Sequence, residues 1–520
     1  MSDGKIDQLP ARFATITRVL ALVLAGLHGL VFLAVVAMRI TYPFDIDFME
    51  SGALDAVAWI RDGHPLYAAP RLEFIPFAYG PLHVWVSAAL ASVTGVDFAP
   101  LRALSVFASL GCAALIGWMV WRDGKSLCAA IVGGGLFLAC FELTGTKFDL
   151  VRIDSLFLLL LLAGLALLQI RGSGLAWMLA GAFITVSFFT KQTALPICLP
   201  LVAYALIVDF KRGILFLATS LGGIIGGIML MDRMTAGWFS HYVLDLPRAR
   251  VGDGLIPSQL VAFWTTDMLQ PLAIAFSLAL LHLLARWERR DWDRLMLHAF
   301  AGAGMIGASW VAKLEGGSYG NNLYPAAAWV ALGFGLGVAT VIERLRESEG
   351  RAHFEAAVWL ACAVQLAALL HDPREHLPTS ADREAAQQLL ARIENIDGDV
   401  LMLQHGHLPR LAGKRPHAHF VGLIDVLRAG RKDDKERLIE EVETALREQR
   451  FGAVIVNSDF ARGGAATEPR APGAPYSAEQ MLRAIEVSYT REGHVFDRPD
   501  VAWMRSGPVT RPEWLYAPSE

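Results

Sequence analysis

Three carboxylates stand close together near the N-terminus, in a region with few other charges. The segment Y-P-F-D-I-D-F-M-E-S-G supplies Asp45, Asp47 and Glu50 directly after a long apolar run. A carboxylate that is partly desolvated at a membrane boundary is suited to accept a proton or to bind a metal ion. Acidic residues ahead of a helix also serve as caps, so a structural role stays open. The pattern favours Asp47 and Glu50 over Asp45 as functional residues.

Charged residues also cluster in two later segments that adjoin apolar runs. K-F-D-L-V-R-I-D-S-L contains Asp149, Arg152 and Asp154, and F-F-T-K-Q-T places Lys191 in a very short turn. Arg152 can bind a phosphate bidentately or pair with Asp149, and Asp154 can act as a helix cap. An ionisable residue as deep as Lys191 is a functional candidate by default, although its side chain can also extend to the membrane surface. Arg152 and Lys191 together could neutralise a phosphate group.

Two further segments combine aromatic and polar residues. W-F-S-H-Y-V-L-D-L-P-R-A-R includes His241, and A-K-L-E-G-G-S-Y-G-N-N-L-Y-P includes Lys313, Glu315 and Asn322. Carboxamides and aromatic rings are common partners of sugars, but Gly and Asn also simply form turns. The sequence has no zinc-ligand spacing, phosphate-binding Gly loop or dinucleotide fingerprint.

The composition indicates which elements must position these residues. Of 520 residues, 54% are hydrophobic and only 18% are charged, whereas soluble domains carry about 25% charged residues. The net charge of -4 gives no basic footprint for nucleic acid. All five cysteines lie in apolar runs, which excludes a secreted disulfide scaffold. Eleven uncharged runs are long enough to cross a membrane: 19–38, 103–121, 126–141, 155–170, 172–190, 192–208, 213–231, 268–285, 295–312, 323–342 and 356–370.

The direction of the spans follows from the basic residues, which accumulate on the cytoplasmic side of short loops. A twelfth apolar segment, 81–96, contains His83 and follows Gly80. If this segment crossed the membrane, the basic segment R-W-E-R-R-D-W-D-R (286–294) would lie outside. We therefore expect eleven spans with the N-terminus inside, 81–96 in the interface and the C-terminal part outside.

The chain divides into two expected domains. Residues 1–371 form the membrane domain, and the stretch 53–61 of its first outer loop (39–102) suits an amphipathic helix lying along the membrane surface. Residues 372–520 are typical of a small extracytoplasmic α/β domain. Its expected strands are D-V-L-M-L (399–403), A-V-I-V (453–456) and V-A-W-M (501–504), its expected helices are 432–448 and 477–487, and a loop rich in Gly, Ala and Pro lies at 462–475.

Six motifs in this order resemble the GT-C superfamily of membrane glycosyltransferases, whose members include protein O-mannosyltransferases, aminoarabinose transferases of lipid A and bacterial Rgt-like galacturonosyltransferases. Within residues 15–345 they are D-I-D-F-M-E-S-G, D-G-H-P-L-Y, Y-G-P-L-H, F-D-L-V-R-I-D-S-L, F-F-T-K-Q-T and G-G-S-Y-G-N-N-L-Y-P. The resemblance implies an α-helical polytopic membrane fold and a sugar donor carried on polyprenyl phosphate. It also implies a catalytic carboxylate in the first outer loop, where Asp47 and Glu50 replace the adjacent Asp-Glu pair of the family.

The reaction implied by the resemblance is a single inverting displacement on the outer face of a bacterial inner membrane. Asp47 or Glu50 would take the proton of an acceptor hydroxyl on an envelope glycan, lipid or protein. The leaving polyprenyl phosphate would be stabilised by Arg152, Lys191 and Arg71. The other side chains expected to contact the substrates are Asp149, Asp154, His83, His241, Lys313, Glu315 and Asn322.

Metal dependence and two other functions stay open at this point. A phosphate is already a fair leaving group, so the chemistry requires no cofactor, but some relatives use a divalent metal that Asp47, Glu50 and Asp154 could hold. A transporter or flippase of a lipid-linked saccharide would use similar charges, although transporters place them near the bilayer midplane. A glycan polymerase or ligase would share the donor type.

Overall fold

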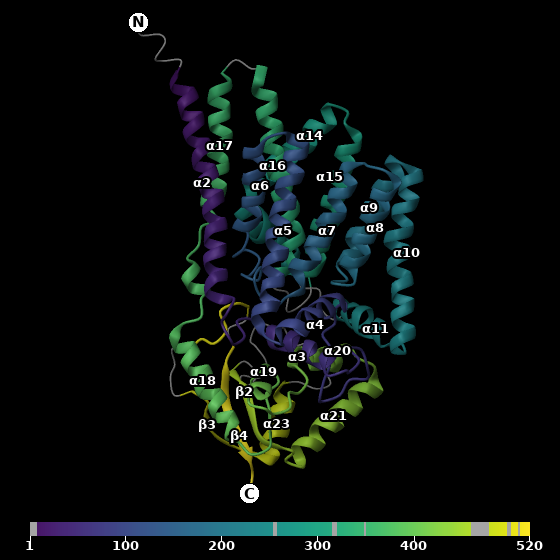
Figure 1. The fold of residues 1–520 in the computed structure, drawn as a ribbon, viewed down its shortest axis with the longest axis vertical. Coiled ribbons are helices and arrows are strands. Elements are labelled where there is room, and N and C mark those ends of the chain that lie inside the picture. The colour runs from purple at the N-terminus through teal and green to yellow at the C-terminus, as the bar shows by residue number, and fades with distance from the viewer. Residues whose placement is uncertain are drawn as a thin grey trace.

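The computed structural model places a long bundle of helices above a smaller domain built from the last 150 residues or so, which we call the tail (Figure 1). The structure describes residues 8–252, 257–314, 320–347, 350–458, 478–496, 501–507 and 510–520. The N-terminus lies at the far end of the bundle from the tail, and the C-terminus lies at the tip of the tail.

Each of the eleven expected spans coincides with a helix of the bundle. The helices are α2 (Gln8–Arg39), α5 (Phe98–Gly124), α6 (Leu127–Ala139), α7 (Ile153–Ile170), α8 (Gly174–Phe188), α9 (Ala194–Val208), α10 (Phe210–Thr235), α14 (Gln270–Glu288), α15 (Trp292–Lys313), α16 (Tyr324–Arg344) and α17 (Arg351–Ala367). Seven helical segments in the described part are long and apolar enough to cross a membrane. Helices α6, α8 and α9 have 13 to 15 residues and rise only about 20 Å. The count of eleven crossings therefore stays a prediction.

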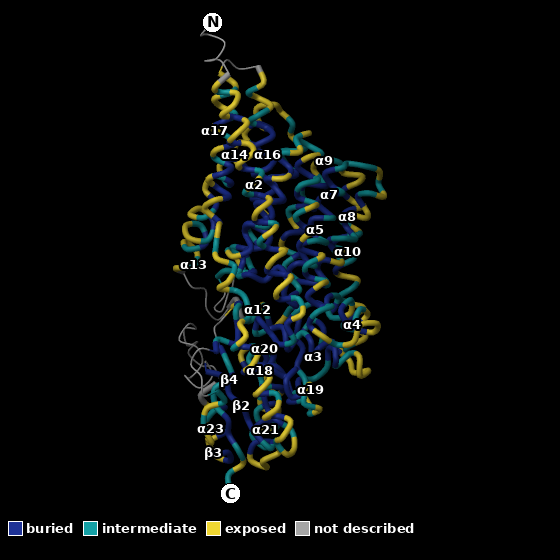
Figure 2. The backbone as a smooth tube through the Cα atoms, turned by 60° about the vertical axis from the view of Figure 1, so that its left-hand side comes forward, coloured by how far each residue is buried: buried dark blue, intermediate teal, exposed yellow. Residues whose placement is uncertain are grey.

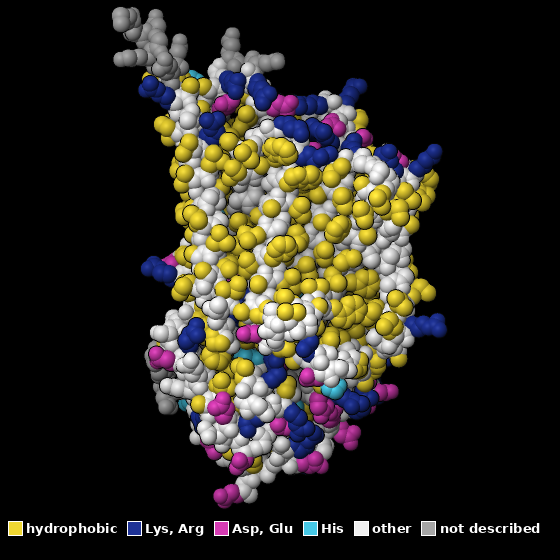
Figure 3. Space-filling view, in the orientation of Figure 1, with side chains coloured by type: hydrophobic (Ala, Val, Ile, Leu, Met, Phe, Trp, Pro, Cys, Tyr) yellow, Lys and Arg dark blue, Asp and Glu magenta, His cyan; other side chains and the backbone are white. Residues whose placement is uncertain are grey.

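Burial within the bundle separates a central helix from peripheral ones. Helix α16 is buried along nearly its whole length, whereas α2 and α10 expose most of their apolar side chains (Figure 2). A broad hydrophobic belt covers the face of the bundle that Figure 3 shows, and Lys and Arg side chains gather at the end that carries the N-terminus. An exposed apolar belt of this size is expected of a protein whose surroundings are lipid.

Short helices connect the bundle to the tail. Helices α3 (Glu50–Arg61) and α4 (Leu82–Thr94) lie beside each other at the tail end of the bundle (Figure 1). The expected helix at 53–61 exists as α3, and its placement along the membrane surface stays a prediction. Residues at its start are buried, Ser51 donates to the Gln404 carbonyl of the tail, and Asp55 pairs with Arg410 of the tail. Helix α3 is therefore enclosed between bundle and tail.

The remaining short elements lie in the connections between the helices of the bundle. They are α11 (Trp238–Ser240), the π-helix η1 (His241–Asp245), α12 (Leu246–Gly252), α13 (Pro257–Ala262), the π-helix η2 (Phe263–Leu269), and the 3-10 turns η3 (Gly320–Leu323) and η4 (Leu345–Glu347).

The tail is an α/β domain with a four-stranded sheet in the order β1-β2-β4-β3. Strands β1 and β2 are parallel, and the other neighbours are antiparallel. The elements are η5 (Pro373–His376), α18 (Ser380–Glu394), β1 (Asp399–Leu401), α19 (His407–Leu411), α20 (Phe420–Ala429), α21 (Lys432–Arg447), β2 (Phe451–Asn457), α23 (Ala478–Ser488), β3 (Tyr489–His494) and β4 (Pro512–Pro518). The expected strands at 399–403 and 453–456 and both expected helices are confirmed, while the loop at 462–475 lies outside the described residues.

One expected strand is wrong. Residues 501–504 do not pair in the sheet, and the last strand is β4 instead. The segment is apolar because it packs: Val501, Trp503 and Met504 join a core with Tyr42 and Phe44 of the first outer loop. The tail and the loop that carries the carboxylates therefore share one hydrophobic core.

Candidate active site

Five charged side chains form one buried series at the tail end of the bundle, and we call this series the charge chain. Its members, in order of contact, are Lys147, Asp47, Arg152, Asp154 and Lys191. The successive N···O distances are 3.3, 2.9, 3.5 and 2.7 Å. All five residues are at most 7% exposed. With three cations and two anions, the charge chain carries one net positive charge.

The charge chain assembles because three separate stretches of the sequence end at the same side of the bundle. Asp47 lies in the loop after α2, and Lys147 and Arg152 lie in the segment between α6 and α7. Asp154 occupies the first turn of α7 rather than its cap position, so its carboxylate is available to Lys191. Lys191 lies in the turn between α8 and α9.

The turn that carries Lys191 packs against the segment that precedes α4. A Cβ atom added to Gly80 would overlap the backbone of Phe189, so only glycine permits this approach. Gln192 donates a hydrogen bond of 2.9 Å to the Ala78 carbonyl. These contacts fix the position of Lys191 relative to the first outer loop.

Two carboxamides from η3 contact the same end of the charge chain. Asn321 donates to the Asp154 carboxylate at 3.1 Å, and the Lys191 ammonium donates to the Asn322 side chain at 3.5 Å. The expected residue Asn322 is thus at the site, and its neighbour Asn321 makes the direct contact with Asp154. His83, at the start of α4, is buried near Asp154 and Arg152.

Glu50 is fully occupied by partners that hold the loop. Its carboxylate accepts two hydrogen bonds from Arg102, at 2.9 and 2.8 Å, and one each from the backbone N–H of Ile46 and Val151. Both side chains of the Glu50–Arg102 pair are 0% exposed. Four donors saturate a carboxylate. Glu50 therefore ties the segments that carry Asp47 and Arg152 to the start of α5.

Arg39 and Asp149 form a second buried pair of this kind. The Arg39 guanidinium contacts the Asp149 carboxylate at 2.9 Å and donates to the carbonyls of Thr146 and His376. Asp149 is thus engaged beside the charge chain rather than within it. The pair joins the end of α2 to the segment before α7 and to the tail.

The tail holds the first outer loop through Asp45. The Asp45 carboxylate lies 2.6 Å from His405 Nδ1 and accepts a hydrogen bond of 3.2 Å from the Trp503 indole. Asn457 contacts the other ring nitrogen of His405 at 2.9 Å. Burial opposes ionisation, but His405 and His407 outweigh it and hold the pKa of Asp45 at about 2. Asp45 is therefore an ionised anchor between loop and tail.

The surroundings set the protonation of the groups that can do chemistry. Burial alone would raise the pKa of the Asp47 carboxyl, but Lys147 and Arg152 outweigh it and hold this pKa below its ordinary value. Burial lowers the pKa of His83 to about 4, with Asp154 opposing this effect. Asp47 is therefore an ionised acceptor at neutral pH, and His83 is uncharged.

Several expected substrate residues lie outside the charge chain. Arg71 is exposed in the loop between α3 and α4, with its backbone paired to Phe74. The Lys313 ammonium lies 3.1 Å from the Asp267 carboxylate, and the His241 ring packs against Trp238. Glu315 lies outside the described residues.

Sequence reasoning missed the partners that come from distant parts of the chain. Lys147 stands in the same motif as Asp149, so its position in the sequence could have identified it as a member of the site. Arg102 is separated from Glu50 by 52 residues and His405 from Asp45 by 360. No local pattern connects residues so far apart.

The carboxylates that could hold a divalent metal face cations instead of one another. Glu50 is saturated by Arg102 and two backbone N–H groups, while Asp47 and Asp154 face Arg152 and lysines. Among the described residues, no group of three His, Cys, Asp or Glu side chains converges as metal ligands do. A site of net positive charge does not fit a divalent cation.

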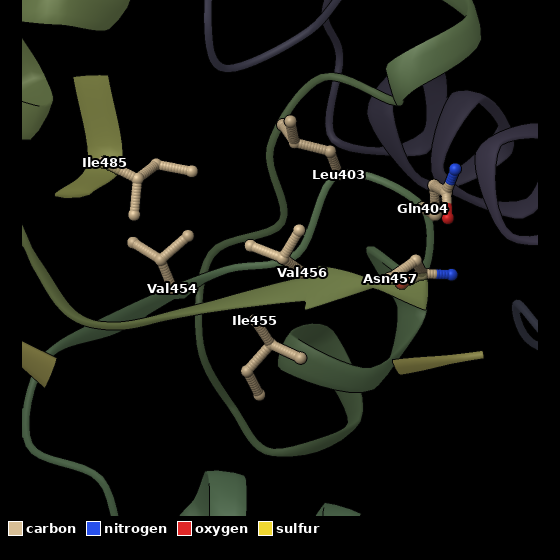
Figure 4. A pocket seen from close by; sticks show the side chains of 7 residues that line it. All are labelled: Leu403, Gln404, Val454, Ile455, Val456, Asn457 and Ile485. Carbon is tan, nitrogen blue, oxygen red and sulfur yellow. The ribbon is translucent and has the colours of Figure 1, made fainter. Parts of the chain in front are cut away.

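A small cavity lies in the tail, apart from the charge chain. Figure 4 shows Leu403, Val454, Val456 and Ile485 around it, with the Gln404 and Asn457 carboxamides at one side. Its volume of about 20 Å³ has room for about one water molecule. It is therefore too small to receive a sugar.

The helical bundle, the short helices and the tail together share their fold with the solved structures of ArnT and AglB, in agreement with the GT-C fold that the sequence motifs predict. The structure is similar to that of ArnT from Cupriavidus metallidurans bound to undecaprenyl phosphate, with a TM-score of 0.59, 12% identity and coverage of 95% of this chain and 97% of ArnT. The apo state of that ArnT gives a TM-score of 0.56 at 11% identity, again over 95% and 97% of the two chains.

The archaeal oligosaccharyltransferase AglB from Archaeoglobus fulgidus, in complex with an inhibitory peptide and a dolichol-phosphate, is also similar. Its TM-score is 0.50 at 12% identity, covering 96% of this chain and 74% of AglB. No protein-family model and no curated protein sequence matches the chain. The likeness is therefore one of fold.

Proposed function

We propose that this protein is an inverting glycosyltransferase that moves a sugar from polyprenyl phosphate to a hydroxyl of an envelope glycan, lipid or protein. The main support for the proposal is the charge chain, because it places two buried carboxylates, Asp47 and Asp154, among three cations at one end of a membrane bundle. The structures of ArnT with undecaprenyl phosphate and of AglB with a dolichol-phosphate support a lipid-linked donor for this fold.

The cations of the charge chain bind the donor phosphate in this proposal. A polyprenyl-phosphate sugar is a phosphodiester with one negative charge, and it acquires a second as the sugar leaves. The charge chain carries one net positive charge, so it balances the donor and stabilises the charge that develops. Arg152 and Lys191 are the main phosphate ligands, and Lys147 adds to the positive electrostatic potential at the phosphate. Arg71 is exposed in the loop between α3 and α4, outside the charge chain, so its contact with the phosphate stays a prediction.

Asp47 is the general base. Its carboxylate takes the proton of the acceptor hydroxyl while that oxygen bonds to the anomeric carbon, and the bond from the anomeric carbon to the phosphate oxygen breaks with its electron pair. The configuration inverts because this is one displacement. A bound phosphate also shares Arg152, which weakens the hold of Arg152 on Asp47 and raises the basicity of Asp47 only when the donor is present.

Glu50 is a positioning residue rather than the base. All four of its acceptor positions are taken by Arg102, Ile46 and Val151, so it has no free lone pair for an acceptor proton. Its contacts set the distance between Asp47 and Arg152. This assignment chooses between the two carboxylates that the sequence left as alternatives.

The proposed orientation puts the charge chain and the tail on the extracytoplasmic side of a bacterial inner membrane. The gathering of Lys and Arg at the opposite end of the bundle supports it (Figure 3). A transporter would need charges near the midplane, and the charge chain lies at one end, which favours an enzyme.

The test is transfer from defined polyprenyl-phosphate sugars to envelope acceptors by purified protein in detergent or lipid. Wild type should form product with inverted anomeric configuration, and Asp47→Asn should lose about 10²–10⁴ of the rate, the usual worth of a general base. Absence of transfer with every donor, together with movement of lipid-linked sugar across vesicles, would support the transporter instead. Transfer of whole glycans would favour a ligase.

A further inference from the structure

The proposed base is sealed off from solvent by the tail. The Asp47 side chain is 0% exposed, so an acceptor hydroxyl cannot reach it in this arrangement. The backbone of Asp47 forms a bridge to that of Ser506, and a Cβ atom added to Gly507 would lie 3.0 Å from Asp47 Oδ2. Gly507 also has φ +77°, which favours glycine. We call residues 505–507 the closing tip.

Neutral hydrogen bonds hold the closing tip to the membrane domain. The backbone N–H groups of Arg505 and Ser506 donate to the Ile46 carbonyl, both at 3.2 Å. The Ser506 hydroxyl donates to the Gly145 carbonyl at 2.8 Å and accepts from the Thr146 hydroxyl at 3.2 Å. Arg505 forms an ion pair with Asp382 within the tail. The tip is thus anchored in the tail and rests on the bundle.

The other walls around Asp47 are held more strongly. Asp47 itself is paired with Lys147 and Arg152, and its loop is tied by the buried Glu50–Arg102 pair. Breaking a buried ion pair leaves an uncompensated charge, whereas the neutral hydrogen bonds of the tip, although buried in this arrangement, are replaced by bonds to water when the tip opens, at small net cost. The cover that separates most easily from Asp47 is therefore the closing tip.

We propose that the closing tip is the acceptor gate of this enzyme: it opens to admit the acceptor hydroxyl to Asp47 and closes to keep water out during transfer. The inference rests on the proposed function for its purpose, since a glycosyltransferase must exclude water to avoid hydrolysing its donor. The tip belongs to the tail and contacts Asp47 from there, so it controls the acceptor and leaves the lipid-borne donor a separate approach.

A reversible crosslink tests the gate directly. Thr146 Oγ1 and Ser506 Oγ lie 3.2 Å apart, so cysteines at both positions are close enough to form a disulfide. In T146C/S506C, oxidation should lower the rate of sugar transfer by at least about ten-fold, and reduction with dithiothreitol should restore the rate. T146C and S506C alone, treated with the same oxidant, serve as controls. Oxidised T146C/S506C that transfers as fast as its reduced form would overturn the gate.

A second measurement does not depend on transfer. We expect a membrane-impermeant maleimide to label S506C slowly, and to label S380C, at an exposed position of the tail, rapidly. Gly507→Ala, which crowds Asp47 and strains the backbone, should speed the labelling of S506C. Labelling of S506C as fast as S380C, or no labelling at all, would overturn the gate. If wild type transfers no sugar while S506C shows the expected slow labelling, the proposed function is wrong but the opening of the closing tip is supported.

Discussion

The role assigned to Glu50 predicts a large loss of stability when its charge is removed. Glu50→Gln keeps the shape of the side chain but replaces one oxygen with a donor, so two of the four donors that now face the carboxylate lose their acceptor. The Arg102 guanidinium, 0% exposed, is left without a counter-charge. Loss of one partner of a buried pair costs about 3–5 kcal/mol, and we expect the free energy of unfolding to fall by about that amount.

The matched control is Glu343→Gln, the same change in a pair that water reaches. Glu343 lies 3.1 Å from Arg289, and the two side chains are 54% and 38% exposed, so the cost should stay below about 1 kcal/mol. Unfolding of the purified proteins in one detergent, followed by intrinsic tryptophan fluorescence, measures both. At temperatures where E50Q is folded, its transfer rate should exceed that of D47N. E50Q as stable as E343Q, or as inactive as D47N while folded, would refute the positioning role.

Two other perturbations follow from the same structure. Lys191→Gln should raise the donor KM by about 10–100-fold, because it removes a charge-assisted hydrogen bond to the phosphate. Lys313→Gln, which breaks an ion pair with an aspartate away from the charge chain, should leave the donor KM unchanged. Steady-state kinetics at varied donor concentration measure both values, and equal effects of the two substitutions would contradict the assignment of Lys191 to the phosphate. Acid should destabilise the tail, because burial lowers the pKa of His407 to about 3 and of His417 and His419 to about 4. The unfolded chain then binds more protons than the folded chain between about pH 6.5 and 4, so the stability is complete above that window and falls as the pH falls through it. Limited proteolysis of the tail at pH 7, 5.5 and 4.5 checks this, and equal resistance at all three would contradict the buried, neutral histidines.

Much of the membrane domain could be predicted because its signals are local. Each apolar run indicates its own helix, since a backbone in lipid must satisfy its hydrogen bonds within one segment. The convergence of Asp47, Arg152, Asp154 and Lys191 followed from topology: loops that leave the membrane on the same side lie near one another. The motif order gave the GT-C fold, which the structural similarity confirms.

The partners of these residues could not be predicted from the same signals. Glu50 and Asp47 have the same charge and similar positions in the sequence, but only the packed structure shows that Arg102 saturates Glu50. The segment at Trp503 looked like a strand because it is apolar, yet its apolar side chains serve the shared core of tail and loop. Contacts between residues so far apart produce no pattern that can be recognised in a single sequence.

The most direct test of the central claim is the transfer rate of Asp47→Asn with a defined polyprenyl-phosphate sugar under saturating donor. If Asp47 is the base, kcat should be lower than that of wild type by about 10²–10⁴. The donor KM should change little, because the phosphate ligands Arg152 and Lys191 remain. A kcat equal to that of wild type would show that Asp47 is not the base, and the proposed mechanism would be wrong.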